Sequence, residues 1–98
     1  MDTNFLFSPQ QIQQQINSRV PNWICQDGKL RVDIPCVNFN EALGLANKIA
    51  HLAEKHNHHP ELYISYTAIV ITLYTHDHRG ITQKDFVLAE EIDILLKT

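Results

Sequence analysis

The sequence predicts an α+β fold of two layers, in which a four-stranded antiparallel sheet carries its helices on one face. Two observations lead to this class. Four short segments have the composition of strands and form two hairpins, and three others begin with helix-start signals. In chain order these elements give α-β-β-α-β-β-α. A chain of 98 residues can bury one modest core, so we expect residues 1–98 to form a single domain.

The first helix is predicted to run from Pro9 to about residue 19. Ser8 is placed to cap it, proline occupies its first position, and Gln11 completes the capping box three residues after the cap. The glutamines that follow are interpreted as a solvated face, because two apolar residues keep the helical spacing. These are Ile12 and Ile16.

The first hairpin is predicted around Asp27-Gly28, a two-residue turn that requires positive φ at both positions. Counting outward from the turn, Cys25 opposes Leu30 and Trp23 opposes Val32. These four residues therefore share one face of the sheet, which the next alternate apolar residue continues. That residue is Ile34.

The second helix begins at Asn38, with Glu41 three residues later, and cannot continue past Pro60. Apolar residues follow at the spacing of a buried stripe, and His56 lies at the end of the same stripe. The stripe consists of Ala42, Leu45, Ala46, Ile49, Leu52 and Ala53.

Two more strands are predicted at about residues 61–66 and 69–76, and Gly80 then turns the chain. Thr82 with Asp85 three residues later caps the final helix, and this capping role is by itself a sufficient explanation for the acidic residue. The buried stripe of the final helix consists of Leu88, Ala89, Ile92, Leu95 and Leu96.

Composition argues against several classes of protein. The net charge is −3 and the basic residues are scattered, which disfavours nucleic-acid binding. The longest apolar run, residues 68–73, is too short to span a membrane, and the N-terminus lacks the pattern of a signal peptide. We therefore expect a cytoplasmic protein, in which Cys25 and Cys36 are free, buried thiols.

Five of the six histidines lie between residues 56 and 78. His58 and His59 come just before one predicted strand, and His76 ends the strand that pairs with it. An antiparallel hairpin brings these two places to one edge of the sheet, where an acid and a base could meet. Spacing alone leaves open two alternatives, solvated histidines without a task and a metal site. Candidate metal ligands are His56, His58, His76 and His78, although their spacing matches no known ligand pattern.

Residues 54–93 closely resemble the pterin-4a-carbinolamine dehydratase family. The resemblance is carried by Asn57-His58-His59-Pro60-Glu61, by Thr75-His76-Asp77 fourteen residues later, and by Gly80, Thr82, Asp85 and Leu88-Ala89. Upstream, Trp23 and Phe39-Asn40-Glu41-Ala42 also correspond to the family pattern. The chain departs from the pattern at Leu62, at Thr67-Ala68 and at His78-Arg79, and no motif histidine is lost.

The resemblance implies a reaction, the loss of water from 4a-hydroxytetrahydropterin to give quinonoid dihydropterin during tetrahydrobiopterin recycling. His58 and His76 would exchange the protons and His59 would help to hold the pterin. Asp85 would support the histidines, with Pro60 and Trp23 contributing to the substrate site. No metal or organic cofactor is implied, since the pterin is the substrate.

The family also implies homodimers or homotetramers, and an aromatic amino-acid hydroxylase or a regulatory protein as a possible partner. Some members act as dimerisation partners of a transcription factor. The alternative function is therefore a non-catalytic binding or regulatory module that assists a partner protein. Three histidines gathered at one end of the sheet favour the enzyme, because a scaffold has no need of them.

Overall fold

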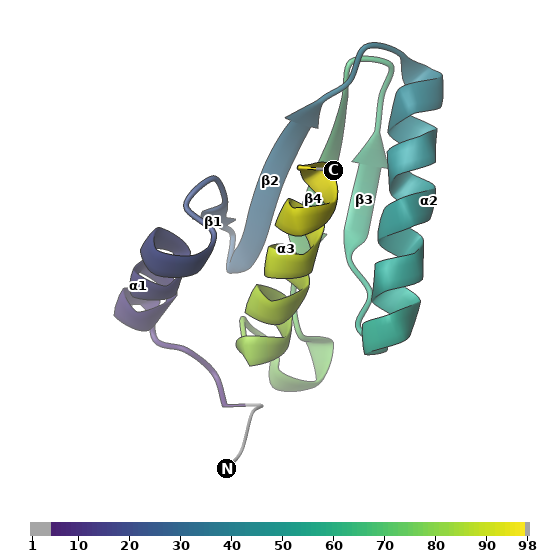
Figure 1. Cartoon of the computed structure of the whole chain (residues 1–98). Coiled ribbons are helices and arrows are strands. Elements are labelled where there is room, and N and C mark those ends of the chain that lie inside the picture. The colour runs from purple at the N-terminus through teal and green to yellow at the C-terminus, as the bar shows by residue number, and fades with distance from the viewer. Residues whose placement is uncertain (1–4, 98) are drawn as a thin grey trace.

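The computed structural model describes residues 5–97, and its elements follow the predicted order (Figure 1). The expected absence of a signal peptide rests in part on residues 1–4, which lie outside the described residues. The elements are α1 (Pro9–Arg19), β1 (Ile24–Gln26), β2 (Lys29–Pro35), α2 (Phe39–His56), β3 (Glu61–Ile64), β4 (Ala68–Leu73), the short 3₁₀ helix η1 (His76–His78) and α3 (Gln83–Leu96).

The four strands form one antiparallel sheet in the order β1-β2-β4-β3. Alternate residues of the two central strands are buried on one face, and their neighbours on the other face are more exposed. Figure 1 shows α3 lying over the middle of the sheet and α2 running alongside β3. The predicted α+β fold, with a four-stranded antiparallel sheet and three helices in this order, is confirmed.

The helices begin at the predicted caps. Ser8 and Gln11 form the capping box of α1, Asn38 accepts the backbone N–H of Glu41 at the start of α2, and Thr82 caps α3. All three helices and both central strands contribute to one apolar cluster. Its buried members are Ile16, Val20, Trp23, Leu30, Val32, Ala46, Ile49, Ile69, Ile71, Leu73, Ile81, Phe86, Leu88, Ala89 and Ile92.

The first hairpin has the predicted register. Cys25 pairs with Leu30, and Asp27 and Gly28 have φ of 54° and 75°. The prediction that both cysteines are buried is wrong for Cys25, whose side chain is exposed, whereas Cys36 is partly buried. The reason is that β1 is a three-residue strand at the edge of the sheet, where the core does not cover it.

The second hairpin has shorter strands than predicted. β3 ends at Ile64 because Ser65 forms a turn, in which its hydroxyl accepts the backbone N–H groups of Thr67 and Ala68. β4 ends at Leu73, and the chain then enters the 3₁₀ helix that contains His76. None of the helices within residues 5–97 is long and apolar enough to cross a membrane.

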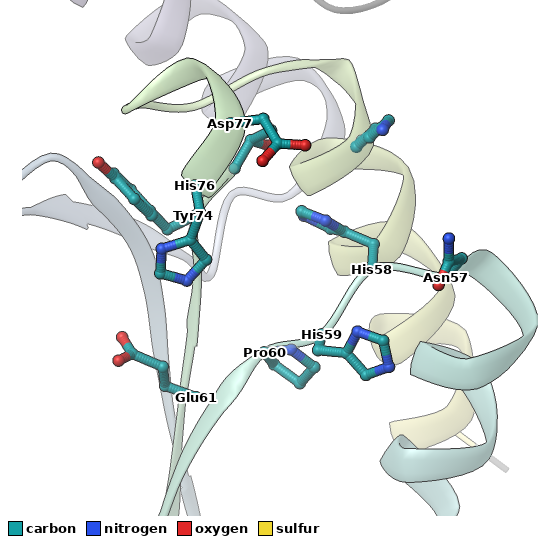
Figure 2. Close-up of a pocket in the computed structure, with 10 residues that line it drawn as sticks. Asn57, His58, His59, Pro60, Glu61, Tyr74, His76 and Asp77 are labelled. Atoms are coloured by element: carbon teal, nitrogen blue, oxygen red, sulfur yellow. The ribbon is translucent and has the colours of Figure 1, made fainter.

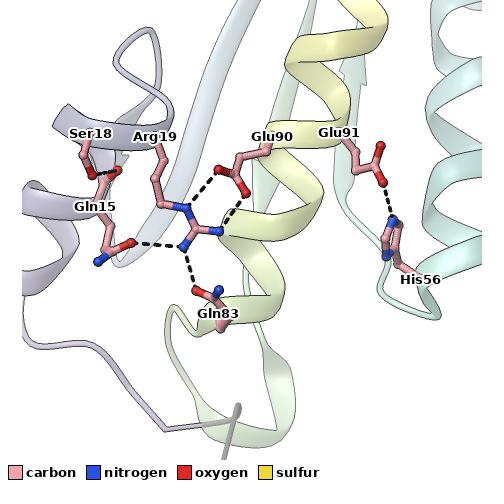
Figure 3. Close-up of polar contacts among 7 residues, drawn as sticks. All are labelled: Gln15, Ser18, Arg19, His56, Gln83, Glu90 and Glu91. Carbon is pink, nitrogen blue, oxygen red and sulfur yellow. Dashed lines mark hydrogen bonds and ion pairs between the residues drawn. The ribbon is translucent and has the colours of Figure 1, made fainter.

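Helices α1 and α3 are joined by the guanidinium group of Arg19 (Figure 3). Its Nε and Nη2 donate to the two carboxylate oxygens of Glu90 at 3.0 and 2.7 Å, and Nη1 donates to Gln15 and Gln83. The same group lies 5.4 Å from the centroid of the Phe86 ring. Hydrogen bonding from Arg19 lowers the pKa of the Glu90 carboxyl below its ordinary value.

Glu90→Gln tests this contact through the pH dependence of stability. Because the pKa of Glu90 is lowered in the folded state by Arg19, the ion pair stabilises the protein above the unfolded pKa of about 4.3. That stabilisation is lost as the pH falls through the lower folded value. We expect Glu90→Gln to melt at a lower temperature than the parent at pH 7, and we expect this difference to shrink as the pH is lowered below about 4.3. Equal melting temperatures at pH 7 would contradict the prediction, and the exposed Asp77, changed to Asn, serves as the control.

Candidate functional site

His58 is brought into the molecule by the way in which α2 ends. Asn57 adopts the left-handed conformation, with φ of 49°, and its N–H donates to the carbonyls of Ala53 and Glu54. The N–H of His58 donates to the carbonyl of Ala53 at 3.1 Å. These bonds form the Schellman arrangement that reverses a chain at a helix end, for which asparagine is a suitable residue. The turn leaves His58 buried, with 9% of its surface exposed.

His58 contacts a buried carboxylate on α3. Its Nε2 lies 2.6 Å from Oδ1 of Asp85, a side chain with no exposed surface. The other carboxylate oxygen, Oδ2, accepts the Thr75 hydroxyl at 2.8 Å and the Thr82 backbone N–H at 2.9 Å. Asp85 therefore completes the helix cap, as the spacing predicts, and also holds one of the candidate histidines.

His76 lies on a closed loop that follows β4. The N–H of Thr75 donates to the carbonyl of Gly80 at 2.9 Å, and the N–H of Arg79 donates to the carbonyl of His76 at 3.1 Å. The His76 ring is exposed and meets the ring of Tyr74 edge to face, with centroids 4.9 Å apart. The loop thus holds its backbone firmly while the imidazole of His76 remains open to solvent.

The two histidine motifs face one pocket of about 350 Å³ at the end of the sheet where β3 begins and β4 ends. We call it the histidine pocket; it is lined by Asn57, His58, His59, Pro60, Glu61, Tyr74, Thr75, His76, Asp77 and Lys84. Figure 2 shows His58 and His76 on opposite sides of this space, with His59 and Pro60 along its lower edge. Its volume lies within the range of pockets that bind small organic molecules.

Most residues predicted for the site come together here. His58, His59, Pro60 and His76 line the histidine pocket, and Asp85 lies behind His58. The ring of His59 is exposed and pairs through Nε2 with the Glu54 carboxylate, one turn back on α2.

Trp23 is not placed with the others. It is 1% exposed in the apolar cluster, and its indole N–H donates to Asp93 at 2.8 Å. Within the described residues 5–97, Trp23 does not line the histidine pocket. The indole ring is packed in the core and is bonded to α3 through Asp93. Within this chain, Trp23 could therefore influence a ligand in the histidine pocket only through other residues.

Sequence reasoning does not identify Tyr74 and Lys84 as pocket residues, and it includes Glu61 only as part of the family motif. The strand period could have indicated Tyr74, because it lies two residues before His76. Glu61 accepts hydrogen bonds from Lys29 at 2.6 Å and from Thr72 at 3.1 Å. These bonds, the Lys29 bond foremost, lower the pKa of Glu61, so it is a carboxylate near neutral pH rather than a proton donor.

No group of three or more His, Cys, Asp or Glu side chains within residues 5–97 is arranged to hold a metal ion. Two of the four histidines considered as ligands are engaged with separate carboxylates. His58 contacts Asp85, and His56 contacts Glu91 at 3.3 Å, as Figure 3 shows. The arrangement is one of imidazoles paired with acids, which suits proton transfer.

Arg79 is expected to store strain beside His76. It has φ of 54°, a conformation that costs a residue with a Cβ atom about 1 kcal/mol or more. We expect Arg79→Gly to have a free energy of unfolding about 1 kcal/mol higher than Arg79→Ala, which loses the same exposed side chain but keeps the Cβ atom. Urea unfolding of the two variants measures the difference. Equal stabilities would show that the turn carries no such strain.

Comparison with known proteins agrees with the resemblance in the sequence. The family model described as pterin 4 alpha carbinolamine dehydratase matches residues 6–95. A protein of Picosynechococcus sp. is 42% identical over 85 residues, which are 87% of this chain and 91% of that protein. A protein of Prochlorococcus marinus is 41% identical over 92 residues, which are 94% and 95% of the two chains. Both carry the name "putative pterin-4-alpha-carbinolamine dehydratase".

A solved structure has the same fold. The crystal structure titled transcriptional coactivator/pterin dehydratase, from Brucella melitensis, aligns with a TM-score of 0.84. The alignment covers 93% of this chain and 98% of that chain, at 24% sequence identity. At this identity the likeness establishes the shared fold.

Proposed function

The chain belongs to the pterin-4a-carbinolamine dehydratase family, and on that premise we propose that it removes water from a 4a-hydroxytetrahydropterin to give the quinonoid dihydropterin. The observation that carries the proposal is the histidine pocket, where His58 and His76 face one space from opposite sides. A buried carboxylate, Asp85, is paired with one of them. The proposed unit of function is the single domain of residues 1–98.

The reaction needs one proton donor and one proton acceptor. The C4a–O bond breaks more easily when the leaving hydroxyl is protonated, and N5 loses its proton as the C4a–N5 double bond forms. Asp85 favours His58 as the acceptor, because a carboxylate stabilises the imidazolium that forms when the ring takes the N5 proton. His76 then donates to the hydroxyl, which leaves as water, and proton exchange with solvent restores both rings.

The remaining pocket residues have binding roles in this proposal. His59 and Pro60 form one edge of the histidine pocket, where they support the flat face of the pterin ring. Glu61 is held as a carboxylate by Lys29, so it can accept hydrogen bonds from the N–H groups of a pterin. No metal or organic cofactor is needed in this scheme, because the substrate itself carries the reactive centre.

The biological setting is part of the same proposal. The reaction regenerates a pterin used by aromatic amino-acid hydroxylases, and the expected compartment is the cytoplasm. The family resemblance suggests that the protein works as a homodimer or homotetramer. Light scattering of the purified protein measures the oligomeric state. If the protein instead assists a partner protein by contact alone, it will not accelerate the dehydration of the pterin in the assay described next.

The test is to generate 4a-hydroxytetrahydropterin and follow its dehydration by absorbance, with and without the protein. We expect acceleration of about 10²–10⁴-fold, the usual contribution of positioned acid and base groups. His51→Ala is the matched control, since His51 is an exposed histidine of α2 that does not line the histidine pocket. A well-folded protein that leaves the rate unchanged would contradict the proposal and favour a binding role.

A further inference from the structure

We propose that Thr75 is a positioning residue, whose hydroxyl fixes Asp85 so that His58 presents its Nδ1 atom, without a proton, to the histidine pocket. The proposal rests on the proposed function for its catalytic consequence. The arrangement of protons that it specifies holds for the free protein and can be measured without substrate.

A buried network of hydrogen bonds connects the start of α3 to His58. Thr75, Thr82 and Asp85 are 4%, 0% and 0% exposed, so water has little access to their polar atoms. The hydroxyls of Thr75 and Thr82 lie 2.9 Å apart, and the Thr75 hydroxyl is 2.8 Å from Oδ2 of Asp85. The backbone N–H of Lys84 donates to the Thr82 hydroxyl oxygen at 3.3 Å. Buried polar atoms of this kind require partners, and here each of them has at least one.

The direction of each hydrogen bond follows from the number of protons available. A hydroxyl has one proton to donate, and Thr75 gives its proton to Asp85. In the contact between the two hydroxyls, Thr82 is therefore the donor and Thr75 the acceptor. The Thr82 oxygen in turn accepts from the backbone of Lys84. The chain of donors thus runs in one direction, toward the Asp85 carboxylate.

Asp85 consequently receives donors on both oxygens. Oδ2 accepts from Thr75 and from the Thr82 backbone N–H, which leaves Oδ1 for His58 at 2.6 Å. A carboxylate so placed is an acceptor, so the neutral His58 ring carries its proton on Nε2. Its Nδ1 then has a free lone pair, and the described residues provide no hydrogen-bond partner for it. This is the tautomer that a base facing the substrate requires.

Thr75 also connects the two histidines. It immediately precedes His76, and its backbone N–H and carbonyl close the loop through Gly80 and the N–H of His78. The same residue therefore anchors the loop of His76 and, through its hydroxyl, the acid that holds His58. Loss of the hydroxyl would therefore loosen the orientation of both rings relative to the pterin.

Nitrogen-15 NMR of the histidine side chains tests the tautomer in the unmodified protein. When the His58 ring is neutral, we expect its Nε2 signal to show an attached proton and its Nδ1 signal to show none, with assignment from the spectrum of His58→Asn. A proton found on Nδ1 would overturn the proposal. This measurement needs neither turnover nor a Thr75 variant, so it remains decisive whether or not the protein is a dehydratase.

Thr75→Val and Thr75→Ser then test the hydroxyl. Valine keeps the shape and removes the donor, and serine restores the donor. We expect Thr75→Val to lower kcat about tenfold, the scale of one hydrogen bond to a charged group, with KM nearly unchanged and a mixture of His58 tautomers in the spectrum. Thr75→Ser should recover both the rate and the single tautomer. A folded Thr75→Val variant with parental kcat and a single Nε2–H tautomer would overturn the role of Thr75, and a lower kcat that serine fails to restore would overturn it as well.

Discussion

We expect replacement of His76 with alanine to lower the rate of pterin dehydration at least tenfold and to leave folding and assembly intact. The rate falls because the proposed donor to the leaving hydroxyl is removed, and such groups contribute about 10²–10⁴-fold. Folding is preserved because the His76 ring is exposed and lies outside the apolar cluster. Its backbone carbonyl still accepts the N–H of Arg79, so the loop keeps its shape.

The measurement compares kcat and the melting temperature of His76→Ala with those of the parent and of His51→Ala. His51 is also exposed, but it lies on α2 and does not line the histidine pocket. Its replacement therefore tests whether the loss of an exposed histidine outside the pocket also lowers the rate. We expect His51→Ala to keep the parental rate. Equal rates in His76→Ala and the parent would remove His76 from the mechanism and with it the proposed pairing of two histidines.

The fold could be predicted from the sequence because its signals are local. The caps at Ser8, Asn38 and Thr82 and the Asp27-Gly28 turn each lie within a few residues of what they determine. The alternation of apolar residues then fixes which face of each strand is buried. The prediction for Cys25 failed because it depends on a feature that is not local. The burial of Cys25 depends on what covers the edge of the sheet, and no pattern near Cys25 carries that information.

The site could be predicted only in part. The hairpin places the His58 and His76 motifs at one end of the sheet, and that much follows from strand pairing alone. The 2.6 Å contact of His58 with Asp85 joins residues 27 positions apart and depends on the angle at which α2 ends. The Lys29–Glu61 pair reaches from β2 to β3 over the intervening β4 and is likewise invisible in the sequence. Side-chain contacts between distant elements require the packed structure.

Asp85 should be the residue whose loss harms both stability and activity most. Asp85→Ala leaves the Thr75 hydroxyl, the Thr82 N–H and Nε2 of His58 without their buried acceptor. Each unsatisfied buried group costs about 1–3 kcal/mol, so we expect the free energy of unfolding to fall by about 3 kcal/mol or more. For a chain of 98 residues this lowers the melting temperature by roughly 15 °C. Asp77→Ala, which removes an exposed acid of the same pocket, should change stability by less than about 0.5 kcal/mol.

Asp85→Asn separates the two roles of this side chain. The amide oxygen of asparagine can accept from Thr75 and from the Thr82 N–H, so most of the cap is kept and the loss of stability should be only about 1 kcal/mol. Its NH₂ group then faces His58 and donates to Nε2, which forces the imidazole proton onto Nδ1. The ring can no longer accept a proton from N5, so we expect Asp85→Asn to be nearly as inactive as Asp85→Ala while remaining much more stable. Urea unfolding and the dehydration assay on the two variants make the comparison. If Asp85→Asn keeps the parental rate, Asp85 acts through the helix cap alone and His58 does not depend on it for catalysis.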